Sequence, residues 1–172
     1  MTLSLAKKDK LLKTAYSEVI AECDTLQIPY GNITNLTINC RAKYRWGQCS
    51  HLPNGNYAIS ISTDLIEPDS VEGLKNTLMH EILHTIKGCM NHGTNWKQWA
   101  DLVNSQLGYD VKRTNSAEEL NVNREPRTRQ IRYKLECTCC GGTVCREKMT
   151  RAIKYPHLYK CGKCGGELRR VL

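Results

Sequence analysis

The sequence predicts an α+β fold over most of its length and a separate small module at its C-terminus. Three observations predict it. Two segments alternate apolar and polar residues as half-buried strands do, an apolar repeat at helical spacing carries two histidines, and the C-terminal quarter contains two C-x-x-C pairs. We predict a core domain over residues 1–109, a linker or extended wrap over residues 110–130, and a compact module over residues 131–172.

The first predicted element is an amphipathic helix over residues 4–23, where apolar residues recur every three or four positions. Alternation then predicts strands over residues 36–40 and 57–61, separated by a turn-forming segment at residues 53–56. A third short strand is expected over residues 44–49. Together these strands predict a small sheet.

The next predicted helix carries the candidate chemistry. Asp69 is a candidate N-cap with Glu72 three residues later, and an apolar repeat continues until Gly88 provides a stop. A further helix is expected from the apolar stripe that includes Trp96 and ends at Gly108. At this spacing Trp96 is interpreted as a core residue.

Residues 80–84 read His-Glu-Ile-Leu-His, which matches H-E-x-x-H. At about 1.5 Å rise per residue, His80 and His84 lie roughly 6 Å apart along one helix face, so that both imidazoles can bind one zinc ion. Glu81 is the candidate catalytic residue, because a carboxylate at this position can accept the proton of the attacking water. The motif predicts a catalytic zinc site.

A catalytic zinc ion usually has three protein ligands and one open position. His92 is the candidate third ligand, because Gly88 allows the chain to leave the helix and double back. Carboxylates at Asp101, Glu118 or Glu119 are alternatives.

The two C-x-x-C pairs have twenty residues between them, and both are followed by glycines. This spacing is typical of a structural zinc ribbon with four thiolate ligands. The predicted ligands are Cys137, Cys140, Cys161 and Cys164, with Cys139 and Cys145 as alternatives to Cys140. A redox dithiol is the less favoured interpretation. The remaining cysteines are interpreted as small buried hydrophobes, namely Cys23, Cys40, Cys49 and Cys89.

The formal net charge of +8 is confined to the C-terminal third. Residues 1–109 hold ten Lys or Arg and ten Asp or Glu, whereas residues 110–172 hold fifteen and seven. Such a segment favours DNA as a partner, although a solvated surface is the plainer alternative. The candidate contacts are Arg132, Lys134, Arg146, Lys148, Arg151 and Lys154.

Residues 1–20 alternate apolar and charged positions and contain no uninterrupted apolar run, so they predict neither a signal peptide nor a membrane span. Ten cysteines without such a signal favour a reducing compartment. We therefore expect a cytoplasmic protein without a membrane partner, or a nucleoid or nuclear one if it associates with DNA.

The order of these motifs resembles the SprT-like family and the related YgjP-type metallopeptidases. The resemblance rests on the segments Arg45-Trp46-Gly47-Gln48-Cys49-Ser50, Ala58–Ser62, Leu78–His84 and Asn91-His92-Gly93. The ending from Tyr159 to Leu168 is similar to the zinc ribbon that follows the SprT domain. The resemblance implies a compact gluzincin-like (minimal zincin) fold with a small sheet over the H-E-x-x-H helix. It also implies a three-histidine zinc site that His92 completes.

The same resemblance implies metallopeptidase activity on a protein substrate, and the eukaryotic Spartan proteases of this family cut proteins crosslinked to DNA. The alternative is an adaptor that binds nucleic acid through its zinc ribbon and has a catalytically idle H-E-x-x-H site. Glu81 distinguishes the two hypotheses, because an idle site needs no general base.

Overall fold

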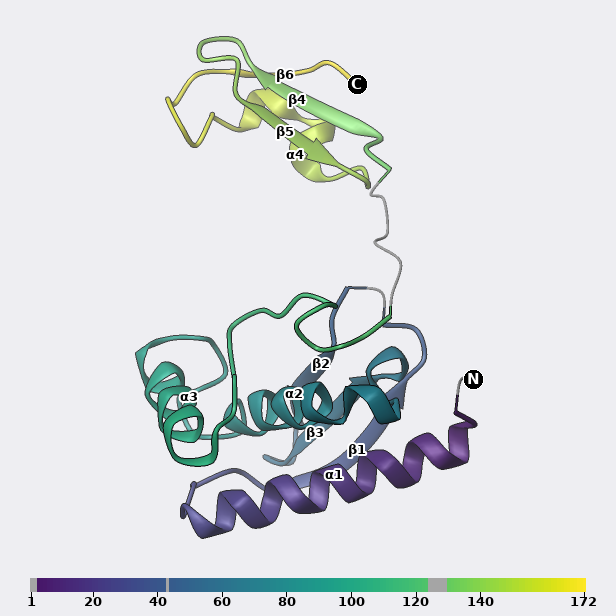
Figure 1. Cartoon of the computed structure of the whole chain (residues 1–172). Coiled ribbons are helices and arrows are strands. Elements are labelled where there is room, and N and C mark those ends of the chain that lie inside the picture. The colour runs from purple at the N-terminus through teal and green to yellow at the C-terminus, as the bar shows by residue number, and fades with distance from the viewer. Residues whose placement is uncertain (1–2, 43, 124–129) are drawn as a thin grey trace. The chain divides into compact units, whose positions relative to one another are not determined.

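The computed structural model describes residues 3–42, 44–123 and 130–172, and the chain divides into two compact units, residues 1–124 and 125–172. Each unit has its own three-stranded sheet together with helices (Figure 1). The α+β class is therefore confirmed. No described helix is both long and apolar enough to cross a membrane.

The first unit contains the three predicted strands and the three predicted helices. They are α1 (Leu5–Thr25), β1 (Ile33–Asn39), β2 (Gly47–His51), β3 (Tyr57–Ser62), α2 (Val71–Leu83) and α3 (Thr94–Leu107), with two short 3₁₀ helices, Thr63–Leu65 and Pro68–Ser70. Gly108, with φ of 73°, ends α3 as predicted, because glycine adopts this left-handed conformation without steric cost.

The sheet of the first unit supports the helix that carries the H-E-x-x-H motif. Its central strand, β3, pairs in parallel with β1 and antiparallel with β2, so that β2 is an edge strand. Helix α2 lies across the sheet and runs beside α1 (Figure 1). Leu74, Leu78 and Ile82 of α2 are fully buried, as is Ile59 of β3. The motif is thus held on a helix with an apolar underside.

Helix α2 is shorter than the apolar repeat suggests. It ends at Leu83, after which Thr85 and Ile86 donate backbone hydrogen bonds to carbonyls three residues back. Ile86 is buried in this tightened turn. The apolar repeat in the sequence therefore continues past the end of the helix, because it follows buried positions and not helical ones alone. At the other end, Ser70 is the N-cap and Asp69 lies in the preceding 3₁₀ helix, so the predicted Asp69 cap is wrong.

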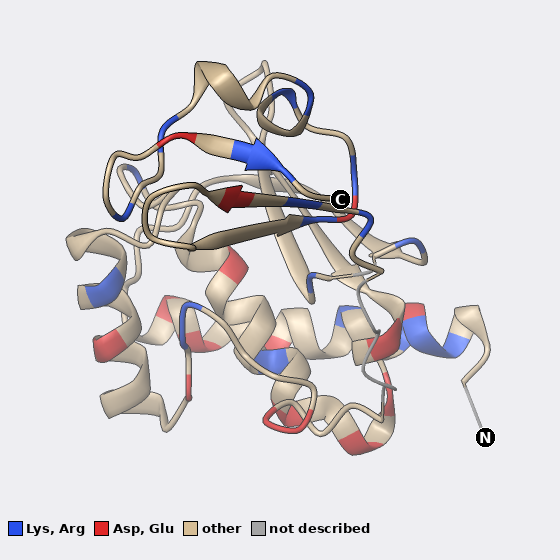
Figure 2. Cartoon of the chain, turned by 90° about the horizontal axis from the view of Figure 1, so that it is seen from above, with Lys and Arg blue, Asp and Glu red and all other residues tan. Residues whose placement is uncertain are grey.

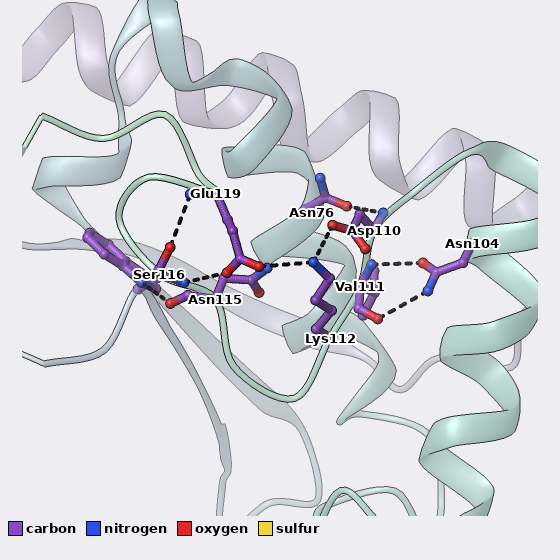
Figure 3. A network of polar contacts seen from close by, with 9 residues as sticks. Asn76, Asn104, Asp110, Val111, Lys112, Asn115, Ser116 and Glu119 are labelled. Carbon is purple, nitrogen blue, oxygen red and sulfur yellow. Dashed lines mark hydrogen bonds and ion pairs between the residues drawn. The ribbon is translucent and has the colours of Figure 1, made fainter.

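Residues 110–120 form a segment without regular strands that we call the strap. Asn104 of α3 bonds both backbone groups of Val111, at 2.8 and 3.1 Å, and Asn76 of α2 accepts the N–H of Asp110 at 2.8 Å (Figure 3). Val111 and Leu120 are buried in the core of the first unit. Of the segment predicted as a linker or extended wrap, residues 110–123 thus contact the first unit, while residues 124–129 lie outside the described residues.

The second unit consists of β4 (Tyr133–Cys137), β5 (Thr143–Arg146), α4 (Arg151–Lys154), a 3₁₀ helix (Pro156–Leu158) and β6 (Leu168–Arg170). Its central strand, β4, pairs antiparallel with both neighbours. Within residues 130–172, only Leu135, Cys137 and Ile153 are buried hydrophobic residues. So small a core requires an additional source of stability, such as a bound metal ion.

Gly73→Ala is expected to destabilise the first unit, although alanine is the better helix former by about 0.8–1.0 kcal/mol. The added Cβ would lie 2.6 Å from the carbonyl oxygen and 2.9 Å from the Cα of Leu120, so the strap would have to lift. Because overpacking costs about 1–3 kcal/mol, it offsets the gain in helix propensity, and we expect a net loss of up to about 2 kcal/mol in the free energy of unfolding.

Denaturant unfolding of the full chain measures this change. The control is Glu72→Ala, an exposed position one residue earlier on α2, which should stay within about 0.5 kcal/mol of the wild type. A Gly73→Ala protein stabilised by about 0.8–1.0 kcal/mol, as helix propensity alone predicts, would contradict the packing described for the strap.

Candidate metal centres and active site

The three predicted histidines converge in the first unit. The Nε2 atom of His84 lies 3.2 Å from those of His80 and His92, which are 3.0 Å from each other. Zinc–nitrogen bonds of about 2.0–2.1 Å in tetrahedral geometry place ligand nitrogens about 3.3–3.4 Å apart, so this group fits one zinc ion. Among the described residues, the group contains no carboxylate. The alternatives Asp101, Glu118 and Glu119 are therefore not part of it.

Backbone carbonyls orient two of these imidazoles. The Nδ1 atom of His80 lies 2.8 Å from the carbonyl oxygen of Lys112, and that of His84 lies 2.6 Å from the carbonyl oxygen of Cys89. A carbonyl can only accept a hydrogen bond, so both Nδ1 atoms carry the proton and both Nε2 lone pairs face the centre of the group. The turn with Gly88, at φ of 83°, supplies Cys89 and leads to His92.

The three imidazoles are held in the neutral form that binds metal. Burial lowers the pKa of His80 to about 4, assisted by the charge of His84 and opposed by the hydrogen bond to Lys112. Burial also lowers the pKa of His84 and, together with the charges of His84 and Arg113, that of His92. All three rings therefore keep an unprotonated nitrogen near neutral pH.

Trp96 closes the apolar side of the histidine group. Its ring centroid lies 4.8 Å from that of His80, 5.6 Å from that of His84 and 4.6 Å from that of His92. Only 2% of Trp96 is exposed, which confirms its interpretation as a core residue. The ring therefore shields one side of the site from water.

Glu81 lies next to the histidine group and is almost fully buried, with 6% of the residue exposed. Burial raises the pKa of its carboxyl group to about 7, against the opposing effects of a backbone hydrogen bond from Cys49 and the positive charge of Arg45. Removing a carboxylate from water is unfavourable, and such perturbed groups concentrate at functional sites. Glu81 is thus a buried carboxylate with a raised pKa, adjacent in the sequence to the candidate ligand His80.

An open cavity of about 200 Å³ gives access to this site. It is lined by His80 and Glu81, by Thr77 on the same helix, by residues 44–47 at the start of β2, and by residues 113–115 of the strap. The indole N–H of Trp46 donates to the carbonyl oxygen of Asn115 at 3.1 Å, which joins the two walls. The cavity therefore has one wall from the edge strand and one from the strap.

A polar network fixes the strap in this position (Figure 3). The ammonium group of Lys112 lies 2.7 Å from the carboxylate of Asp110 and 3.0 Å from that of Glu119. Glu119 also accepts the backbone N–H of Ser116 at 2.7 Å, and the Ser116 hydroxyl accepts the N–H of Glu119. The Lys112 carbonyl orients His80. The network therefore supports the candidate ligand His80 through a segment that does not belong to α2, the helix that carries this histidine.

Sequence reasoning missed the strap as part of the site. Its composition is polar, and its two buried residues, Val111 and Leu120, follow no helical or strand period. The contact that matters is made by a backbone carbonyl, which has no signature in the sequence. Two apolar residues inside a polar stretch were the available signal.

The second unit brings the four predicted cysteines together. Their sulfur atoms all lie within 4.8 Å of one another, with 3.5 Å between Cys137 and Cys164 and 3.7 Å between Cys140 and Cys161. Four Zn–S bonds of about 2.3 Å in tetrahedral geometry place the sulfurs about 3.8 Å apart, so the set fits a zinc ion. Cys139 lies outside this group.

Backbone N–H groups prepare the first cysteine of each pair for metal binding. The N–H groups of Cys140 and Cys139 donate to the Cys137 sulfur and lower its pKa to about 6. The N–H groups of Lys163 and Cys164 likewise lower the pKa of Cys161. A lowered pKa favours the thiolate, which is the form that binds zinc.

Of the four cysteines interpreted as small buried hydrophobes, two are buried and two are not. Cys23 and Cys89 are fully buried, as expected of small hydrophobes. Cys40 is exposed, because it lies just beyond the end of β1, and Cys49 is half-buried on the edge strand. For these two the prediction of full burial is wrong.

The six basic residues predicted to contact DNA do not share one face of the second sheet. Lys134 pairs with Cys145 across β4 and β5, so the side chains of Lys134 and Arg146 point to opposite faces. Arg151 and Lys154 lie on α4. Lys and Arg residues are spread over the strands and loops of this unit (Figure 2). The full set, Arg132, Lys134, Arg146, Lys148, Arg151 and Lys154, is therefore not confined to one face of the sheet, and all but Lys134 are exposed.

We expect the purified protein to contain two zinc ions in different environments. His92→Ala should remove one of them, because two histidines hold the ion poorly, and should leave the second unit folded. Cys161→Ser should instead unfold the second unit, since metal binding provides much of its folding free energy. Elemental analysis and NMR spectra of the full chain test both changes. Full zinc content in His92→Ala would exclude His92 as a ligand.

Comparison with known families agrees with this geometry. A model of the SprT-like family matches residues 24–124, a span that contains Glu81, the three histidines and the strap. No curated protein and no solved structure matched the chain. Since the matched span covers more than half of the sequence and holds the whole histidine site, the chain belongs to the SprT-like family.

Proposed function

We propose that the chain is a zinc-dependent metallopeptidase that hydrolyses peptide bonds in protein substrates. The observation that carries this proposal is the buried carboxylate of Glu81 beside three converging imidazoles, with Glu81 and His80 lining the same open cavity. Membership of the SprT-like family supports a metallopeptidase-type function.

A zinc ion held by the three imidazoles would supply a Lewis acid and lower the pKa of a water in its open coordination position. Glu81 would accept a proton from the attacking water while the water oxygen bonds to the carbonyl carbon of the peptide. It would then deliver this proton to the leaving nitrogen as the C–N bond breaks. The carbonyl groups of Lys112 and Cys89 keep His80 and His84 oriented throughout.

The edge strand offers a place for an extended peptide. Among the residues that the structure describes, β2 has a partner strand on one side only, and the residues that lead into it line the cavity beside Glu81. A peptide segment can add to such an edge through backbone hydrogen bonds, which would place its chain next to the reacting groups. This arrangement favours cleavage within an unfolded or flexible segment of a protein.

A catalytically idle adaptor is the less favoured function. Metal binding alone needs the histidines and the four cysteines, whereas Glu81 is not part of either ligand group and its burial costs free energy. A hydrolase, in contrast, would use this buried carboxylate as its general base.

Glu81→Gln should abolish peptide-bond hydrolysis and leave both metals and the fold in place. The amide keeps the shape of the side chain but cannot accept a proton from water, and loss of a positioned general base costs about 10²- to 10⁴-fold. Casein or histone cleavage measures the loss, and Glu118→Gln, an exposed carboxylate, is the control. Activity within a few-fold of wild type in Glu81→Gln would rule out this mechanism.

We further propose that the second unit binds DNA, so that the peptidase acts on proteins associated with or crosslinked to DNA. Residues 1–124 contain thirteen Lys or Arg and thirteen Asp or Glu, whereas residues 125–172 contain twelve and four. The entire net charge therefore belongs to the second unit, and a positive surface of this kind attracts phosphates.

Exposed aromatic rings accompany the charges at α4. The Lys154 ammonium lies 5.2 Å from the ring centroid of Tyr155, and Tyr155 and Tyr159 are both exposed. Bases of a single strand can stack on such rings while cations contact the phosphates. This combination favours single-stranded over duplex DNA and predicts little base preference.

Replacing Arg151 and Lys154 together by alanine should weaken binding of single-stranded DNA without loss of zinc. At about −0.7 per phosphate contact, the slope of log K against log salt should become shallower by about 1.4. Affinities of the full chain between 50 and 200 mM salt measure this. Lys7→Ala with Lys10→Ala, exposed on α1, is the control. A wild-type protein that does not bind DNA at 50 mM salt would remove this part of the proposal.

A further inference from the structure

Gly47, the first residue of β2, lies directly against the side chain of Glu81. A Cβ atom built on Gly47 would lie 2.5 Å from Oε1, 2.7 Å from Cγ and 2.9 Å from Cδ of Glu81. Carbon atoms in contact prefer about 3.5–4.0 Å, so the carboxylate and a side chain at position 47 cannot occupy their places together.

The backbone gives no other reason for a glycine at this position. Gly47 is not among the residues with positive φ, so any L-residue could adopt its conformation. A glycine inside a strand weakens that strand and often marks a close approach by another group. Here the approaching group is the Glu81 carboxylate.

Two further residues near Gly47 in the chain interact with the Glu81 carboxylate. Cys49, two residues along the same strand, provides a backbone hydrogen bond to it, and the charge of Arg45 lies close by. Glu81 is 6% exposed and lines the cavity together with Gly47 and His80. Strand β2 thus lies against the Glu81 carboxylate. Gly47 leaves the space for it, and Cys49 donates a backbone hydrogen bond to it.

We propose that Gly47 is a positioning residue for the general base, which acts by leaving the space that the Glu81 carboxylate occupies. This inference rests on the proposed function, because it concerns the group that moves the proton. A glutamate side chain can rotate away from an added methyl group, whereas the strand cannot easily move. A side chain at position 47 would therefore displace the carboxylate and leave the fold and both metal sites in place.

Gly47→Ala in the full chain tests this inference. A displacement of about 1 Å in a reacting group can cost on the order of 10²-fold, so kcat on a quenched-fluorescence peptide should fall by about that factor. The zinc content should remain at the wild-type value. The matched control is Gly162→Ala, where the added Cβ meets no atom within 4 Å, and its kcat should not change.

A double-mutant cycle separates positioning from a general structural effect. Glu81→Ala removes the three atoms that a Cβ at position 47 would meet. Adding Gly47→Ala to Glu81→Ala should then change the residual activity by less than about twofold, against a loss of about 10²-fold in the wild type. An equal loss in both backgrounds would show that Gly47 acts on the structure generally, and would overturn the inference.

A crystal structure of zinc-loaded Gly47→Ala gives a result that does not depend on activity. The inference expects a displaced Glu81 carboxylate with His80, His84 and His92 unmoved. A carboxylate in its original place would overturn the inference, whether or not the protein cleaves peptides. A wild type without peptidase activity would instead count against the proposed function, and the carboxylate position in the variant would still decide the role of Gly47.

Discussion

The first unit is organised around three imidazole nitrogens held 3.0–3.2 Å apart. Lone pairs at this separation repel one another, and the protons of His80 and His84 are directed at backbone carbonyls, so they cannot bridge the rings. A cation at the centre would convert this repulsion into attraction. The buried helix, the reversal at Gly88 and the strap together hold the rings at this separation.

Features of this site that depend on local sequence could be predicted, and features that depend on tertiary contacts could not. A separation of four on a helix fixes the relation of His80 to His84, and Gly88 allows the reversal that returns His92. The carbonyl of Lys112 contacts His80 across 32 residues, and its role depends on how the strap lies on α2 and α3. Gly47 meets Glu81 through a similar long-range contact, which no local period encodes.

The second unit shows the same division between composition and arrangement. The spacing of its cysteines predicts a metal site with four sulfur ligands, because two tight turns bring the four sulfurs together. The charge composition predicts a basic unit but not its distribution, since strand alternation sends Lys134 and Arg146 to opposite faces. With Leu135 and Ile153 as its main buried side chains, this unit has a small core, and a metal ion held by the four cysteines would provide the stability that a larger core would otherwise give.

The division of charge between the units has a consequence for selectivity. Because residues 1–124 are balanced in charge, they exert no strong long-range attraction on a polyanion, and any such attraction comes from residues 125–172. Near the reacting groups the charges are few and specific, with Arg45 and Arg113 both lining the cavity. On the proposed function, the second unit would select where the protein acts, and the cavity would select which peptide segment it cuts. Changes in salt should then affect recruitment to DNA far more than hydrolysis of a small free peptide, because screening acts mainly on the exposed charges of the second unit.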